Sequence, residues 1–184
     1  MPYKPLNKAD ILRALNRLGA LAQAKGLTLE VALYGGAVFT VVYGSRDSTK
    51  DVDAIVRPSE PARRIVLQVA REQDLPEDWL NDNVRQFLAA SEEKRRLPSE
   101  EFGPGLAVSV PTAAYLLAMK VNACRAPLPG YAGDQEDILF LVRKMELKSF
   151  GRVEEVYHRF FPRDEIPELC RLAIEAVLGK ARST

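Results

Sequence analysis

Apolar residues recur every three or four positions in the first part of the chain, between residues 8 and 25. Those on the shared face are Ile11, Leu15, Leu18 and Ala22. This spacing is typical of a helix that buries one face. Asp10 is the expected N-cap of this helix, and Gly26 the expected residue just beyond its end.

Apolar runs without helical spacing predict three strands. Residues 27–36, LTLEVALYGG, read as a strand that ends at two glycines. Residues 51–56, DVDAIV, and residues 106–111, LAVSVP, are the other two. Residues 37–44, AVFTVVYG, contain β-branched residues that favour a strand, but we interpret them as a short helix opened by the glycines.

Start signals and apolar patterns in the rest of the chain predict mostly helices. The predicted helices cover residues 59–73, 112–125, 134–147, 151–161 and 164–180. Residues 75–90 are interpreted as a turn with a short helix. The Pro- and Gly-rich stretches 91–105 and 126–134 are interpreted as loops.

This order predicts an α+β fold, in which a small mixed sheet packs with helices and a helical C-terminal half follows. We expect residues 1–110 to form the α/β core and residues 111–184 to form a helical region packed on that core.

The composition limits the classes of function that the chain could have. The chain has 184 residues, 47% of them apolar, with 26 basic against 25 acidic side chains. Such a balance does not indicate general binding to nucleic acid or to a membrane surface, although a local basic patch remains open. Two distant cysteines and one histidine do not form a standard zinc site, and free buried thiols in a reducing compartment are expected. Since no apolar run is long enough to span a bilayer, we expect a cytoplasmic protein.

Two carboxylates, Asp51 and Asp53, stand at the start of the second predicted strand. Side chains two residues apart on a strand share a face, so these two lie side by side while Val52 and Ala54 face the core. Hard oxygen ligands of this kind suit Mg²⁺ or Mn²⁺. The alternative is a solvated strand end, because a D-x-D pair alone is a weak signal.

The residues that precede the Asp51–Asp53 pair strengthen the hypothesis of a metal site. Gly35 and Gly36 end the preceding strand, and glycines let a phosphate approach the backbone. A tight turn alone would also explain two glycines. The order of strand, Gly-Gly, helix, small polar loop and D-x-D strand is more specific than any one of its parts.

The stretch LYGGAVFTVVYGSRDSTKDVDAIV resembles the DNA polymerase β-like nucleotidyltransferase superfamily, in which Gly-Gly or Gly-Ser precedes an Asp-x-Asp or Asp-x-Glu pair. Its form is most similar to minimal bacterial nucleotidyltransferases of the AbiEii toxin-like type. It is also similar to a bacterial family that shares P-x-D-W-L-N-D, here PEDWLND at residues 76–82. The resemblance spans roughly residues 29–145, so residues 1–110 would be a nucleotidyltransferase-like core.

The resemblance implies a Mg²⁺-dependent (or Mn²⁺-dependent) enzyme that moves a nucleoside monophosphate from an NTP to an acceptor. The acceptor would be a tRNA, another RNA, a protein or a small molecule. The resemblance also implies that the protein could act as a toxin with a cognate antitoxin. Asp51 and Asp53 would hold the metal. The implied nucleotide-binding residues are Gly35, Gly36, Ser45, Arg46, Thr49, Lys50 and Arg125.

Lys120 lies among apolar neighbours on its predicted helix, where lysine is rarely placed without a partner. Its ammonium either reaches out to water or turns inward to a carboxylate or phosphate. Asp134 and Asp137 would make a good N-cap and N3 pair for the next helix. The resemblance implies catalytic roles for Lys120 and Asp137, with Asp134 as a competitor. Arg125, at the helix end, would meet either the helix dipole or a triphosphate.

The sequence departs from the superfamily on the third strand, where a further carboxylate usually stands and this chain offers only Ser109. Either Asp137 supplies that ligand from a helix, or the ligand is missing. The alternative function is therefore a catalytically degenerate relative that binds a nucleotide or a protein partner. A third hypothesis is an interaction protein that uses the helical C-terminal half.

Overall fold

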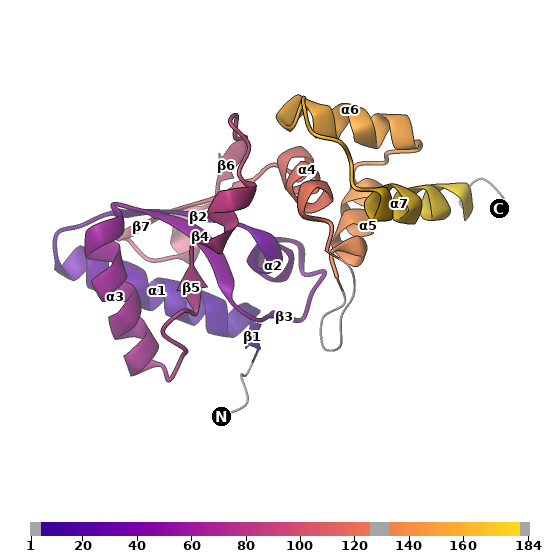
Figure 1. Ribbon diagram of the computed structural model, residues 1–184. Coiled ribbons are helices and arrows are strands. Elements are labelled where there is room, and N and C mark those ends of the chain that lie inside the picture. Colours follow the sequence, from indigo (N-terminus) through magenta and orange to yellow (C-terminus); the bar gives the residue numbers. More distant parts are fainter. Residues whose placement is uncertain (1–4, 126–132, 181–184) are drawn as a thin grey trace. The chain divides into compact units, whose positions relative to one another are not determined.

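The computed structural model describes residues 5–125 and 133–180, and the chain divides into two compact units (Figure 1). Unit 1 holds the residues up to Gln86 together with Lys94–Val110. Unit 2 holds Phe87–Glu93 and the residues from Pro111 onward. Each unit is described separately below.

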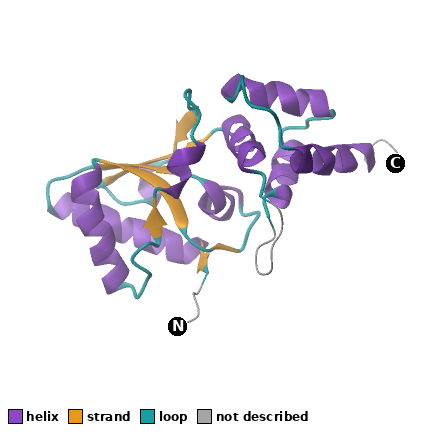
Figure 2. Cartoon of the chain, viewed as in Figure 1, coloured by secondary structure: helices purple, strands orange, loops and turns teal. Residues whose placement is uncertain are grey.

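Unit 1 contains a five-stranded mixed sheet, drawn in orange in Figure 2. Its strands follow the order β5-β4-β2-β7-β6. Its strands are β2 (Leu29–Leu33), β4 (Val52–Arg57), β5 (Leu80–Asn81), β6 (Lys94–Arg96) and β7 (Leu106–Pro111). Strand β2 runs antiparallel to β4 and parallel to β7, and β4 runs parallel to β5. The predicted α+β fold with a small mixed sheet is therefore confirmed.

The two faces of this sheet differ in burial. One face carries apolar side chains that are almost fully buried, namely Leu29, Val31, Leu33, Val52, Ala54, Leu106, Val108 and Val110. The other face carries Asp53 and, through the strand register, Ala32 and Ser109. Asp53 and Ser109 are only half-buried. The sheet of unit 1 therefore has one core face and one face where polar side chains are tolerated.

Two helices of unit 1, α1 (Lys8–Ala24) and α3 (Ser59–Glu72), pack on each other. Helix α1 approaches the core face closely, because a Cβ on Gly19 would lie 3.1 Å from Cγ of Leu106. The predicted N-cap of α1 is wrong. Asn7 is the cap and accepts from the Asp10 backbone N–H, while the Asp10 carboxylate accepts from the Asn7 N–H, which makes a capping box.

A short helical segment follows the two glycines, as predicted. It comprises α2 (Gly35–Val38) and a π-helical turn (Phe39–Tyr43) that ends at Gly44, whose φ is 61°. Since Val38 and Phe39 are fully buried, core packing holds these β-branched and aromatic residues in a helix against their local preference.

The sequence patterns missed the shortest strands of unit 1. Strands β1 (Leu6–Asn7) and β3 (Ser48–Thr49) pair antiparallel. Strand β6 lies in the stretch interpreted as a loop, which also contains a 3₁₀ turn at Ser99–Glu101. Strand β5 precedes a second 3₁₀ turn, Asn83–Phe87, within the stretch interpreted as a turn and a short helix. Two or three residues carry no readable alternation, so these strands depend on their tertiary partners.

Unit 2 is helical. It consists of α4 (Ala113–Ala123), α5 (Gln135–Lys144), α6 (Phe150–Phe160) and α7 (Glu168–Lys180). Helix α4 begins after its N-cap Thr112, the residue at which the predicted helical range starts. Helix α6 packs on α4 through the rings of Phe160 and Tyr115, whose centroids are 4.9 Å apart. Within the described parts of the chain, no helix has the length and apolar character that crossing a membrane requires.

Candidate functional site

Asp53 lies directly against the backbone of Gly35. A Cβ on Gly35 would lie 2.6 Å from Oδ2 of Asp53, closer than real side chains approach. The φ of Gly35 is +54°, in the left-handed region that favours glycine. The Tyr34 N–H donates to the Asp53 carbonyl at 2.9 Å, which ties the two chain segments together. Position 35 therefore favours glycine for two reasons, its left-handed backbone conformation and the Asp53 carboxylate, which a Cβ would displace.

Gly36 lies equally close to the loop that precedes β4. A Cβ on Gly36 would overlap Oγ1 of Thr49 and would lie 3.6 Å from Nη1 of Arg46. Pairing of β3 with β1, in which Thr49 lies opposite Leu6, fixes the loop. The Arg46 guanidinium also lies over the Phe39 ring, 5.8 Å from its centroid. The structure thus brings Gly36, Thr49 and Arg46 together.

Asp51 precedes β4 and is half-buried. Its Oδ2 accepts a hydrogen bond of 3.1 Å from Nδ2 of Asn81. Asn81 is the register partner of Asp53 on the neighbouring strand, so the Asn81 side chain belongs to the same end of β4. Sequence reasoning did not single out Asn81. The only signal was its place within PEDWLND, because the contact depends on a two-residue strand.

Ser45 and Lys50, two further predicted nucleotide-binding residues, are exposed. The Ser45 backbone N–H donates to the Phe39 carbonyl at 3.1 Å and so closes the π-helical turn. Both residues belong to the same loop as Arg46 and Thr49. The structure therefore brings Gly35 against Asp53 and Gly36 against Thr49 and Arg46 at one end of β4, and Ser45 and Lys50 lie in the loop that leads to this strand.

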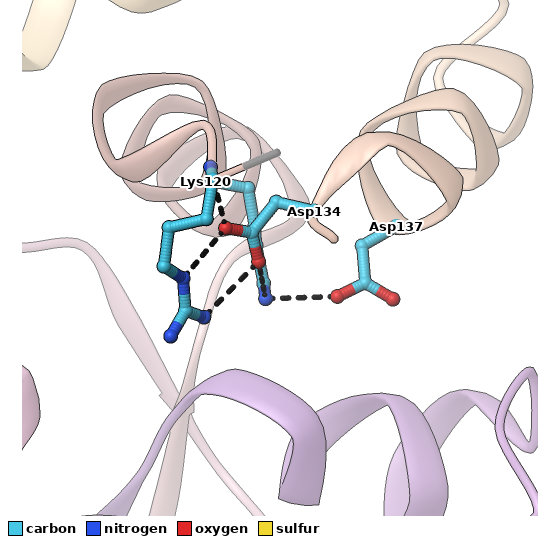
Figure 3. A network of polar contacts seen from close by, with 4 residues as sticks. Lys120, Asp134 and Asp137 are labelled. Carbon is cyan, nitrogen blue, oxygen red and sulfur yellow. Dashed lines mark hydrogen bonds and ion pairs between the residues drawn. The ribbon is translucent and has the colours of Figure 1, made fainter. Parts of the chain in front are cut away.

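In unit 2, Lys120 is buried at 7% exposure, and its ammonium turns inward (Figure 3). Nζ lies 2.7 Å from Oδ1 of Asp134 and 2.8 Å from Oδ2 of Asp137. Arg125 adds a second cation, with Nε 2.9 Å and Nη2 3.2 Å from the two Asp134 oxygens. Of the two arrangements considered for Lys120, the structure has the inward one, with carboxylates as its partners.

Asp134 is fully buried, and its electrostatics follow from these neighbours. Burial alone would raise the pKa of the Asp134 carboxyl, but hydrogen bonds from Arg125 and Lys120 and the Lys120 charge outweigh burial. The pKa of Asp134 therefore lies well below its usual range. The expected capping role is wrong for this side chain, because within the described residues it makes no cap hydrogen bond to α5. Instead it also accepts from the Arg125 backbone N–H at 3.0 Å.

A metal ion would rely on few protein ligands here. Among residues 5–125 and 133–180, no three His, Cys, Asp or Glu side chains gather where they could hold a metal ion. Ser109 lies on the same sheet face as Asp53, with strand β2 between their strands, and carries a hydroxyl rather than a carboxylate. The chain's two cysteines, Cys124 and Cys170, are both free and buried, as expected.

The predicted site residues thus fall into two groups, one in each unit. Unit 1 contains the glycines, the polar loop and the Asp51–Asp53 pair, and unit 2 contains Lys120, Arg125, Asp134 and Asp137. Comparison of the chain with protein-family models, with curated proteins and with solved structures finds no match.

Proposed function

We propose that the protein is a Mg²⁺-dependent nucleotidyltransferase, which moves a nucleoside monophosphate from an NTP to an RNA, protein or small-molecule acceptor. One observation carries the proposal. Asp53 is seated on Gly35 at the end of β4 where Thr49 and Arg46 meet Gly36. A metal–triphosphate complex requires carboxylates for the metal, basic side chains for the phosphates and glycine backbone that the phosphates can approach, and these groups meet at one end of β4.

The donor set fits one Mg²⁺ or Mn²⁺ shared with the substrate. Magnesium typically takes one or two protein carboxylates and completes its shell with water and substrate phosphates. Asp51 and Asp53 are the residues that would hold it. Such an ion neutralises charge on the triphosphate and polarises the reacting phosphoryl group.

The chain's own groups would bind and orient the nucleotide. Arg46 and Lys50 supply positive charge for phosphate oxygens, and Ser45 and Thr49 supply hydroxyls. A role for Lys120 at the transferred phosphoryl group, for Asp137 beside it and for Arg125 at the triphosphate remains a prediction. Two carboxylates, those of Asp134 and Asp137, already contact the Lys120 ammonium.

The test is incubation of the protein with each labelled NTP, Mg²⁺ and total RNA, with EDTA as the metal control. Label in RNA, in the protein itself or in a small molecule would identify the acceptor class. Asp51→Asn and Asp53→Asn should each reduce transfer about 100-fold or more, since each removes a charge that positions the reaction. Asp47→Asn is the matched control, because Asp47 is an exposed carboxylate in the same loop.

A catalytically degenerate relative is the second candidate, and Ser109 is the observation that favours it. The superfamily that the sequence resembles places a carboxylate on this strand, whereas this chain has a hydroxyl on the Asp53 face. Mg²⁺-dependent nucleotide binding without label transfer to any acceptor would support it. Growth arrest on expression, relieved by Asp53→Asn, would instead support an active toxin.

A further inference from the structure

Both the nitrogen and the oxygen of the Asn81 side-chain amide have hydrogen-bond partners. Its Nδ2 donates to Oδ2 of Asp51 at 3.1 Å and to the Asp78 carbonyl at 3.3 Å. Its Oδ1 accepts from the Asn83 backbone N–H at 3.0 Å. A flipped amide would place its oxygen against a carboxylate and a carbonyl, and its NH₂ group against an N–H. The partners therefore fix which end of the amide faces Asp51.

The backbone that carries this amide is also fixed. Strand β5 pairs with β4 so that Asn81 lies beside Asp53, and the Val52 N–H donates to the Trp79 carbonyl at 2.7 Å. Trp79 is fully buried, and its indole N–H donates to the Val66 carbonyl of α3 at 3.3 Å. Asn81 is thus held by the core of unit 1, while its side chain reaches the half-buried Asp51.

The geometry points to Asn81 as a positioning residue, whose amide orients the Asp51 carboxylate toward the divalent cation that Asp51 and Asp53 hold. This inference rests on the proposed function, because it concerns the same cation. The amide engages Oδ2 of Asp51 and leaves Oδ1 for another partner. A carboxylate held in this way needs no reorientation when a cation binds, so less conformational freedom is lost on binding.

The loss of such an outer partner typically lowers metal affinity about 10- to 100-fold. Asn81→Ser is the decisive variant. A serine hydroxyl can still accept from the N–H two residues later, which preserves the local turn, but it is too short to reach Asp51. Asn83→Ala is the matched control, because Asn83 contributes its backbone N–H to this network and keeps it in the variant.

The experiment is a Mn²⁺ titration of the full chain followed by electron paramagnetic resonance of the free ion, alone and with a non-hydrolysable NTP analogue. Urea unfolding followed by fluorescence of Trp79, the single tryptophan, reports the stability of unit 1 in the same samples. Asn81→Ala, which removes both the donor and the acceptor, is the second variant.

We expect Mn²⁺ affinity to fall about 10-fold or more in Asn81→Ser and Asn81→Ala, and to remain at the wild-type value in Asn83→Ala. Wild-type affinity in a folded Asn81→Ser would overturn the role of Asn81 and leave the proposed function standing. Equal losses of affinity in Asn81→Ser and Asn83→Ala would also overturn it. Absence of Mn²⁺ binding to the wild-type chain, with or without nucleotide, would overturn both proposals.

Discussion

The carboxylate of Asp53 occupies the space that a side chain on residue 35 would need. Its Oδ2 would lie 2.6 Å from a Cβ on Gly35, and Gly35 itself has a φ of +54°. Position 35 therefore carries two separate demands for glycine, one on the backbone dihedral angle and one on space beside the acid. The two demands can be tested separately, because other glycines of the chain carry only one of them.

We predict that Gly35→Ala destabilises unit 1 and displaces Asp53. The left-handed conformation costs alanine about 1–2 kcal/mol, and relief of the clash with Asp53 adds to that cost. Urea unfolding followed by Trp79 fluorescence measures the stability. Mn²⁺ affinity, measured on the folded variant, should also fall, since the acid must move.

Gly26→Ala is the control for Gly35→Ala. Gly26 has a φ of +67°, but no atom among the described residues lies within 4 Å of a Cβ placed there. Its alanine variant should therefore lose about 1–2 kcal/mol and keep the wild-type Mn²⁺ affinity. If both variants lost the same stability and bound Mn²⁺ equally, crowding at Asp53 would have no consequence.

The sequence was sufficient to predict the α+β fold and most of the longer elements, because periodicity reports burial directly. For Lys120 the sequence allows two directions, outward to water or inward to a partner. The apolar neighbours on its helix favour a buried partner, and the structure has the inward direction. The sequence did not predict the role of the Asp134 side chain. An N-cap pattern is local, whereas the cations that engage Asp134 come from the end of α4.

Asn81 shows the other limit of the sequence. A strand of two residues has no alternation to read, and the bond from Asn81 to Asp51 crosses 30 positions of sequence. Strand β6 was hidden for a different reason, since its Lys-Arg-Arg sequence is wholly charged and exposed. In both cases pairing with a neighbouring strand, rather than side-chain pattern, defines the element.

Removal of the Lys120 ammonium should destabilise unit 2 strongly. Lys120→Met removes the ammonium that contacts the buried Asp137 at 2.8 Å and the buried Asp134 at 2.7 Å, while Arg125 still pairs with Asp134. Breaking a buried pair from one side typically costs about 3–5 kcal/mol. Urea unfolding is followed in parallel by far-UV circular dichroism, which reports the helices of both units, and by Trp79 fluorescence, which reports unit 1. A transition that shifts in circular dichroism alone then measures the cost to unit 2.

Arg152→Met is the matched control for Lys120→Met. Arg152 pairs with Glu155 at 2.6 Å on α6, but both side chains are about two-thirds exposed, at 67% and 65%. Exposed pairs of this kind contribute little to stability, because solvent screens their attraction. A cost for Lys120→Met no larger than that of Arg152→Met would show that the buried cluster does not stabilise unit 2.

The stability that Asp134 contributes should depend on pH. Arg125 and Lys120 hold the pKa of Asp134 below its usual range despite burial, so the folded state binds a proton less readily than the unfolded state. This contribution is fully present above the ordinary Asp pKa of about 3.9 and is lost as the pH falls toward the folded-state pKa. The unfolding free-energy difference between wild type and Asp134→Asn should therefore shrink between about pH 5 and pH 3.

The measurement for Asp134 is urea unfolding by circular dichroism at several pH values for both proteins. Taking the difference cancels the contribution of acids that the two proteins share. Glu155→Gln, at an exposed carboxylate, should show a small difference at every pH. A difference for Asp134→Asn that stays constant from pH 7 to pH 3 would contradict the assigned pKa direction.

Two tyrosines of unit 2 should ionise late in an alkaline titration. Burial raises the pKa of Tyr115 to about 12, and burial likewise raises the pKa of Tyr157 to about 12. The fold therefore favours the neutral phenols, and their contribution to stability is lost as the pH rises above the ordinary value of about 10.

Absorbance at 295 nm should show part of the tyrosinate signal delayed beyond pH 10, and Tyr115→Phe should reduce that delayed part. In urea the delay should disappear, because the unfolded chain exposes every phenol to water. If Tyr115→Phe instead reduced the signal that appears near pH 10, the Tyr115 hydroxyl would be accessible to water, in conflict with its burial beside the Ala89 N–H.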